Sequence, residues 1–220
     1  MVEAAVENLD AAISAERAKA DRIELCVRLA EGGTTPPPEL IQSVKRTVRI
    51  PVFVLVRPRA GDFVYAASEL RTMQRDIASA IGAGADGIVT GALTAKHRLD
   101  VDGTQGLVKA ARGIPVTFHR AFDEVHNRPE VLEQLIELGF TRILTSGGAA
   151  AAKEGVEGIA ELVRKGGQRI EIAAGGGVRA HNVVELLRRS RVREVHARLV
   201  DETGMRDLVA TVRGYDSRSA

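Results

Sequence analysis

Short apolar strands that alternate with helical segments constrain the fold of this chain more than any other feature. In residues 116–119, the apolar Val116 and Phe118 fall on one side of a strand and the polar Thr117 and His119 on the other. This sorting arises because successive side chains of a strand point to opposite faces. Helical patterns separate such strands along the whole chain. The alternation is typical of a parallel sheet covered by helices.

The number of these strands favours a closed barrel. The predicted strands are residues 2–6, 22–27, 51–57, 86–91, 114–120, 141–146, 169–174 and 193–197. Eight strands with helices between them are typical of the TIM-type (β/α)8 barrel, whereas an open doubly wound sheet of this length usually has fewer. No linker-like segment divides the sequence, so we expect an α/β fold with a single domain over residues 1–220. The strands occupy about residues 2–197, and a C-terminal helix and polar tail are expected over 203–220.

Polar residues occupy one face of many predicted strands, and this face should line the barrel because the apolar face packs on helices. The inward positions include Glu3, Glu24, Cys26, Arg57, Thr117, His119, Glu171, Glu194 and His196. Most barrels fill this space with valine, isoleucine and leucine. A buried unpaired charge is costly, so these groups must pair with one another, as Arg22 and Arg57 would with the glutamates, or bind a ligand. We expect them to gather at the carboxyl ends of the strands.

Several of these side chains are candidates for acid–base catalysis. His119 would transfer a proton, with Asp123 or a glutamate orienting its ring. Glu3 and Glu24 lie on neighbouring predicted strands, where two carboxylates can share a proton and one pKa rises. The same pair could instead bind a hard divalent ion.

A second set of residues predicts an anion-binding site. The candidates are Arg57, Arg59, Ser146, Gly147, Gly176 and Gly177. A guanidinium fork matches planar oxyanions, and glycine lets backbone amides approach an anion closely. Phosphate sites in barrels of this kind commonly use the loops after the late strands. A tight strand-to-helix turn explains the glycines equally well.

The composition argues against several classes of protein. The net charge is only +2, and five phenylalanines, two tyrosines and no tryptophan offer few stacking surfaces, so we expect no nucleic-acid binding. The sequence has no apolar run of membrane-spanning length, and its first residues are too acidic for a signal peptide. A single cysteine, Cys26, excludes an internal disulfide and a multi-cysteine zinc site. We therefore expect a cytoplasmic protein without a membrane partner.

A set of short motifs identifies a family resemblance. The motifs occupy residues 21–26, 31–36, 57–65, 117–123, 144–148 and 194–196. Together they resemble the copper homeostasis protein CutC family, over about residues 2–197. The resemblance implies a TIM-type barrel, a cytoplasmic location, a homo-oligomer and a role in copper trafficking or tolerance.

One departure from the family pattern concerns copper directly. Members of the family often carry a cysteine on the first strand, where this chain has Ala5, so only Cys26 remains. Cu(I) is soft and prefers thiolate or thioether ligands, usually at least two. A copper site would therefore use Cys26 with His196 or His119. Cys26 as an ordinary buried core residue is the competing interpretation.

The sequence leaves three functional hypotheses and does not decide whether the protein is an enzyme. The first is a CutC-like protein that binds or traffics copper as Cu(I), with Cys26 and His196 as ligands. The second is a barrel enzyme that acts on a small phosphate- or carboxylate-bearing metabolite by acid–base chemistry. The third is a scaffold that binds a partner through an apolar surface.

Overall fold

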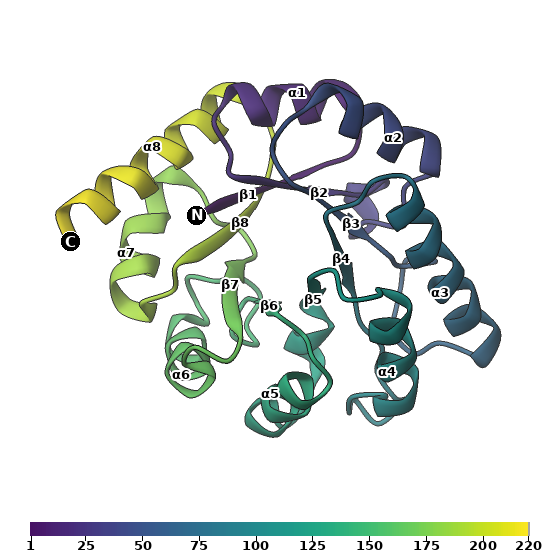
Figure 1. The fold of residues 1–220 in the computed structure, drawn as a ribbon. Helices are drawn as coiled ribbons and strands as arrows, with labels where there is room; N and C mark the ends of the chain where they lie inside the picture. Colours follow the sequence, from purple (N-terminus) through teal and green to yellow (C-terminus); the bar gives the residue numbers. More distant parts are fainter. Residues whose placement is uncertain (220) are drawn as a thin grey trace.

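Eight parallel strands close into one barrel in chain order, and β8 pairs with β1 (Figure 1). The computed structural model describes residues 1–219. Its strands are β1 (Val2–Val6), β2 (Arg22–Leu25), β3 (Val52–Leu55), β4 (Gly87–Thr90), β5 (Val116–Phe118), β6 (Arg142–Thr145), β7 (Glu171–Gly175) and β8 (Glu194–Arg198). The prediction of a TIM-type (β/α)8 barrel is thus confirmed.

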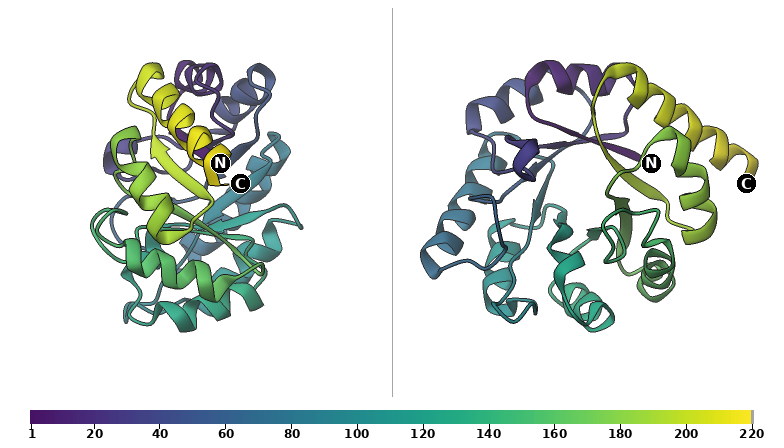
Figure 2. Two further views of the ribbon diagram at one scale, coloured as in Figure 1. Left: turned by 90° about the vertical axis from the view of Figure 1, so that its left-hand side faces the viewer. Right: turned by 180° about the vertical axis from the view of Figure 1, so that it is seen from behind.

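A ring of helices surrounds the barrel. They are α1 (Leu9–Arg17), α2 (Pro38–Thr47), α3 (Ala67–Gly82), α4 (Val101–Ala110), α5 (Arg128–Glu137), α6 (Val156–Gly166), α7 (Ala180–Ser190) and α8 (Glu202–Ser219), with short 3-10 turns η1 (Leu29–Glu31) and η2 (Arg120–Glu124). Seen from behind, α8 in yellow lies next to α1 in purple and completes the ring (Figure 2). Within residues 1–219, no helix combines the length and apolar character needed to cross a membrane.

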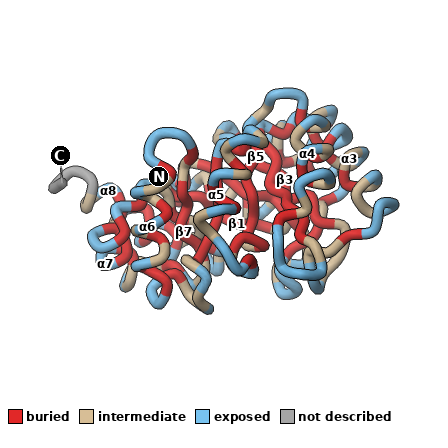
Figure 3. Tube along the Cα trace, turned by 90° about the horizontal axis from the view of Figure 1, so that it is seen from below, coloured by how far each residue is buried: buried red, intermediate tan, exposed pale blue. Residues whose placement is uncertain are grey.

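The main core lies between the outer face of the strands and the helices. Val2, Ala4 and Val6 of β1 all belong to this buried cluster, as their alternation with Glu3 and Ala5 predicts. Figure 3 shows the buried strands at the centre and the exposed segments at the periphery. Since the apolar residues take the outer face, the polar residues of the strands are forced into the interior.

The C-terminal helix is longer than expected. The sequence predicts a polar tail after a short helix, but α8 continues to Ser219, and only Ala220 lies outside the described residues. Arg213 donates from Nη2 to the carbonyl oxygen of Lys19 and to Asp21 Oδ1, at 3.0 and 3.1 Å. These contacts fasten a polar part of the helix to the turn between α1 and β2.

Strands β2 to β6 end one or two residues earlier than the sequence predicts, which moves several candidate residues into loops, whereas β7 and β8 end one residue later. Cys26, Arg57, His119 and Ser146 each lie just beyond the end of a strand. The Arg57 N–H donates to Thr35 Oγ1 at 3.0 Å and not to a neighbouring strand, and His119 is the N-cap residue that precedes the turn η2. The carboxyl-end candidates therefore belong to the loop layer above the sheet.

A prediction concerns the tight packing of the interior. A Cβ atom at Gly87 would lie 2.6 Å from Cζ of Phe53, a buried ring on the neighbouring strand. We expect G87A to lower the free energy of unfolding by about 1–3 kcal/mol, because overpacking forces the ring to move. Urea denaturation measures the effect. The matched control is G82A at the end of α3, where an added Cβ has no neighbour within 4 Å. Equal stability of G87A and wild type would contradict the packing argument.

Candidate functional site

The charged side chains of the interior form two groups, not the single cluster at the carboxyl ends that the sequence predicts. Glu3, Arg22, Arg142 and Glu194 each occupy the first or second residue of a strand, at the amino ends. Arg57 and His119 lie at the carboxyl ends, together with the loops. We refer to the first set, with His196 and Glu24 above it, as the interior network.

Two buried arginines bind the carboxylates of the interior network. Arg22 Nε lies 2.5 Å from Glu3 Oε2, and its Nη2 lies 2.6 Å from Glu194 Oε2. Arg142 Nη2 lies 2.9 Å from Glu3 Oε1, and its Nε lies 2.8 Å from Glu194 Oε2. Arg142 Nη1 also donates to Thr117 Oγ1 at 3.4 Å. The ion pairs alone tie four strands together across the barrel.

Arg142 is a member of the network that was not predicted from the sequence. The alternation of apolar and polar residues along a strand could have identified Arg142 as inward, because its neighbour Ile143 packs outward in the main core. Arg22 was expected to neutralise the glutamates, and the structure places it there. Glu171, which was expected inside, is only half-buried and lines a cavity beside Glu194 at the amino end.

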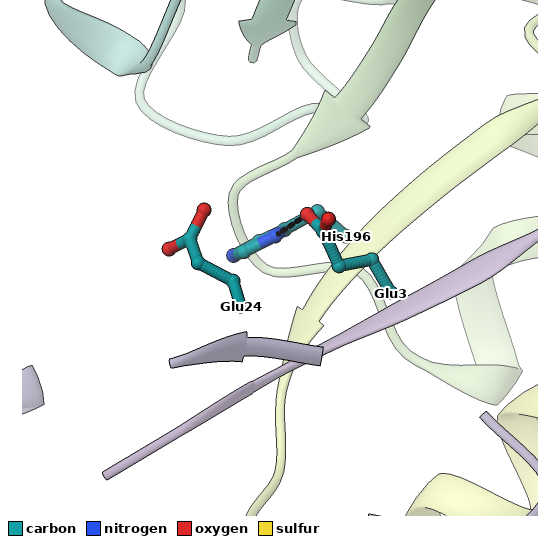
Figure 4. Close-up of side chains that lie close together, drawn as sticks. All are labelled: Glu3, Glu24 and His196. Atoms are coloured by element: carbon teal, nitrogen blue, oxygen red, sulfur yellow. Dashed lines mark hydrogen bonds and ion pairs between the residues drawn. The ribbon is translucent and has the colours of Figure 1, made fainter. Parts of the chain in front are cut away.

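Glu3, His196 and Glu24 form the upper part of the network, with the imidazole between the two carboxylates (Figure 4). His196 Nδ1 lies 2.8 Å from Glu3 Oε1. One ligand-type atom from each of the three side chains lies within 4.8 Å of the others. The Oε2 atom of Glu24 is buried and has no hydrogen-bond partner. The site thus presents an unsatisfied carboxylate oxygen to a histidine and a second carboxylate.

The environment moves the pKa values of these groups apart. Burial raises the pKa of Glu3, but Arg142, the His196 hydrogen bond and Arg22 outweigh burial and hold it well below its usual value. Burial, reinforced by the charge of Glu3, raises the pKa of Glu24. Burial lowers the pKa of His196, yet Glu24 and Glu3 outweigh it and raise the value overall. The network therefore separates a firmly ionised carboxylate from one that tends to hold a proton.

The charges of the network cancel only when Glu24 holds a proton or a further cation is present. Glu3, Glu24 and Glu194 supply three carboxylates, whereas Arg22 and Arg142 supply two guanidinium groups. When all three carboxylates are ionised, one negative charge remains for a protonated His196 or a bound cation to balance. In a buried site this excess charge attracts a cation strongly.

His119 is buried at the carboxyl end as a neutral side chain. Its Nδ1 accepts from the N–H of Ala121 at 3.3 Å, its Nε2 has no partner, and its ring lies 4.7 Å from that of Phe63. Burial, with the nearby charge of Arg57, lowers its pKa to about 3. Asp123 or a glutamate was expected to orient this ring, but the backbone of Ala121 is what contacts Nδ1.

Asp123 instead fills the loop that was expected to bind an anion. Its carboxylate accepts from Thr145 Oγ1 at 2.5 Å and from the N–H groups of Ser146 and Gly148 at 3.0 Å. It also pairs with Arg120 at 2.8 Å. The backbone donors that a phosphate would use in this loop are thus engaged by an internal carboxylate.

The glycines of the two late loops have packing roles. Gly147 has a φ of +74°, and a Cβ there would lie 2.1 Å from the carbonyl oxygen of Gly155. Gly176 has a φ of +104°, and its carbonyl oxygen accepts from the N–H of Ala152 at 2.9 Å, while Gly177 has a φ of +73°. The left-handed conformations account for glycine at these positions without a ligand.

Arg57 and Arg59, the two arginines expected to clamp an anion, hold loops in place. Arg57 donates to the carbonyl oxygens of Gly33 at 3.0 Å and Gly61 at 2.6 Å. Arg59 pairs with Asp62 at 2.9 Å and with Glu69 at 2.7 Å. Both guanidinium groups therefore donate to the protein itself.

Cys26 lies in a small apolar cluster inside the barrel with Phe53, Leu55 and Val89. Its thiol donates to the carbonyl oxygen of Val6 at 3.7 Å. Burial, with the charges of Glu24 and Glu7, raises the pKa of the thiol. This is the environment of an inert core cysteine, because metal ligation needs the thiolate. Cys26 is also not a member of the Glu3, Glu24 and His196 group.

Comparison of the sequence with known proteins identifies the same family by a family model and by individual relatives. A model of the CutC family matches residues 1–200. The copper homeostasis protein cutC homolog of Homo sapiens is 45% identical over 208 residues, which cover 94% of this chain and 76% of that protein. A family protein CutC of Glaesserella parasuis is 46% identical over 195 residues, covering 89% of this chain and 80% of the relative.

Solved structures agree with the sequence comparisons. The putative copper homeostasis protein CutC from Streptococcus agalactiae superimposes with a TM-score of 0.85 at 37% identity, covering 89% of this chain and 97% of that one. An N-(5'-phosphoribosyl)anthranilate isomerase from Pyrococcus furiosus has a TM-score of 0.63 at 17% identity, covering 97% of this chain and 98% of the isomerase. The latter likeness shows the barrel fold alone.

Removal of Arg142 should destabilise the protein strongly. We expect R142M to lower the free energy of unfolding by about 3–5 kcal/mol, because Glu3 would stay buried without a main partner. The control is R169M, which breaks the half-exposed pair with Glu133 and should cost far less, because an exposed ion pair contributes little to stability. Chemical denaturation at neutral pH compares the two. Similar losses in both variants would show that the interior network contributes no more than a surface ion pair.

Replacement of Glu24 should stabilise the protein at neutral pH, in contrast to the removal of Arg142. Because its pKa is raised in the folded state, its ionised form opposes folding above the unfolded-state pKa of about 4.3. We expect E24Q to unfold at higher denaturant concentration than wild type at pH 7. The difference should vanish as the pH falls to about 4, where the carboxyl is protonated in the folded state and largely so in the unfolded state. A less stable E24Q at pH 7 would contradict this prediction.

Proposed function

The chain belongs to the CutC family, and from this premise we propose that it serves copper homeostasis by binding a copper ion inside the barrel, on Glu3, Glu24 and His196. The names of its relatives connect the family with copper homeostasis. In this proposal the copper ion is the cargo of the protein and not a resident cofactor. Direct binding is the part of the proposal that goes beyond those names.

The observation that carries the proposal is the unpartnered Oε2 atom of Glu24. A buried polar atom without a hydrogen bond costs free energy, and such atoms are rare in folded proteins. This atom belongs to a carboxyl group beside His196 and Glu3, in a network that has one excess negative charge when all three of its carboxyl groups are ionised. A bound cation would satisfy both the oxygen and the charge.

The donor atoms favour Cu(II) over Cu(I). An imidazole nitrogen and carboxylate oxygens are typical ligands of Cu(II), whereas Cu(I) prefers sulfur. The sequence-based hypothesis of a Cu(I) site on Cys26 and His196 has less support, because Cys26 lies in the apolar cluster and its thiol donates a hydrogen bond to the carbonyl oxygen of Val6. A cation on His196 Nδ1 and Glu3 Oε1 would take the place of the hydrogen bond between them.

The second hypothesis is a barrel enzyme for a small anionic metabolite. It has weaker support, because the residues predicted to bind the anion have partners within the protein. Arg57 and Arg59 are engaged by loop carbonyls and carboxylates, and Asp123 occupies the amides around Ser146. A cytoplasmic location and homo-oligomeric assembly, both implied by the family resemblance, remain predictions.

Titration calorimetry with Cu²⁺ tests the proposal on protein freed of metal by a chelator. We expect wild-type protein to bind one ion, and E24Q to bind at least about 100-fold more weakly, since even the loss of a residue that only supports a ligand weakens affinity by about 10–100-fold. Affinity should fall at acid pH, because the ligands must lose their protons.

Cys26→Ala is the matched variant that separates the two copper hypotheses. We expect it to bind Cu²⁺ as wild type does. A competition assay with Cu⁺ under reducing conditions completes the comparison. Loss of copper binding in the Cys26 variant together with full binding in E24Q would overturn the proposed site and restore the thiolate as the ligand.

A further inference from the structure

A cavity of about 490 Å³ opens at the carboxyl ends of β1 and β8, apart from the interior network. Its lining includes Val6 at the end of β1, Arg198 at the end of β8 and Arg179 at the start of α7. The carbonyl oxygen of Val6 accepts the thiol hydrogen of Cys26, so one residue that lines the cavity contacts the apolar cluster. In barrels of this kind, the carboxyl-end loops are where ligands bind.

The two arginines of this cavity are available to a ligand. Arg198 forms no side-chain hydrogen bond or ion pair with any residue whose side chain the structure describes. The side chain of Arg179 donates from Nη1 to the carbonyl oxygen of Val178, at 2.7 Å, and makes no ion pair within the described part of the chain. Arg57 and Arg59, by contrast, are engaged by neighbouring loops. Arg179 and Arg198 therefore retain free donors at the mouth, although no sequence pattern singled them out.

We propose that this cavity binds a small organic anion, whose carboxylate or phosphate group is held by Arg179 and Arg198. Guanidinium groups bind planar oxyanions through paired, charge-assisted hydrogen bonds. Asn8, the N-cap residue of α1, also lines the cavity, and the positive end of the helix dipole favours an anion there. The volume falls within the range of small-molecule sites.

The rest of the lining restricts the ligand further. Leu29 and Val200 supply apolar surface, and Val200 is 70% exposed. Glu7 also lines the cavity, with its Oε2 accepting from the N–H of Leu29 at 3.0 Å, and its negative charge opposes a multiply charged anion. A compact molecule with a single anionic group and a short carbon chain fits these surroundings best.

Calorimetry with inorganic phosphate and with propionate tests the proposal, at constant ionic strength set by chloride. Wild-type protein should bind at least one of the probes saturably, and the stronger of the two identifies the anionic group as phosphate or carboxylate. R198Q and R179Q should each weaken binding at least about tenfold, because each removes a charge-assisted contact. R198K should fall between R198Q and wild type, since it keeps the charge without the fork.

R188Q is the matched control, because Arg188 is exposed on the same helix as Arg179 and does not line the cavity. It should bind the probes within about twofold of wild type. Circular dichroism establishes that each variant is folded. The proposal is overturned if wild type binds neither probe saturably, or if R188Q loses as much affinity as R198Q and R179Q.

Discussion

The charged interior of this barrel depends on the ion pairs that Glu3 forms with two arginines. A carboxylate on the first strand would be costly to bury alone, but Arg22 and Arg142 approach it from two other strands at 2.5 and 2.9 Å. Glu194 is the second partner of both guanidinium groups, and His196 bonds to Glu3 Oε1, an oxygen that Arg142 also contacts. The positions that most barrels fill with branched aliphatic side chains thus carry a charged layer, and within it Glu24 Oε2 is a buried carboxylate oxygen without a hydrogen-bond partner.

The mouth of the barrel differs from the interior, because many of its polar groups form hydrogen bonds and ion pairs with one another. Asp123 takes the amides around Ser146 that would otherwise receive a ligand, and Arg57 and Arg59 hold their own loops. Two arginines that form no ion pair within the described residues, Arg179 and Arg198, lie in the cavity at the junction of the first and last strands. The two proposals therefore concern different chemistry at different depths: a cation among nitrogen and oxygen donors within the barrel, and an anion at its rim.

The sequence predicted the barrel well, because alternation and strand count are local signals that survive without knowledge of packing. The inward direction of Glu3, Glu24 and His196 followed from the same alternation. Contacts between strands could not be predicted in this way: the register of β1 against β8 places His196 beside Glu3, and no local pattern encodes it. For the same reason the glycine loop after β6 suggested an anion site, although its anion is the carboxylate of Asp123, which lies 23 residues before Ser146 in the chain.

The hydrogen bond between Glu3 and His196 joins positions 193 residues apart, almost the full length of the chain. During synthesis from the amino end, the first strand leaves the ribosome long before its last partner exists. Until β8 emerges, the nascent chain must keep the carboxylate of Glu3 hydrated or in provisional contact with Arg22 and Arg142, which come earlier. Closure of the ring and completion of the charged layer are consequently a single late event, and such long-range pairing is the kind that slows folding.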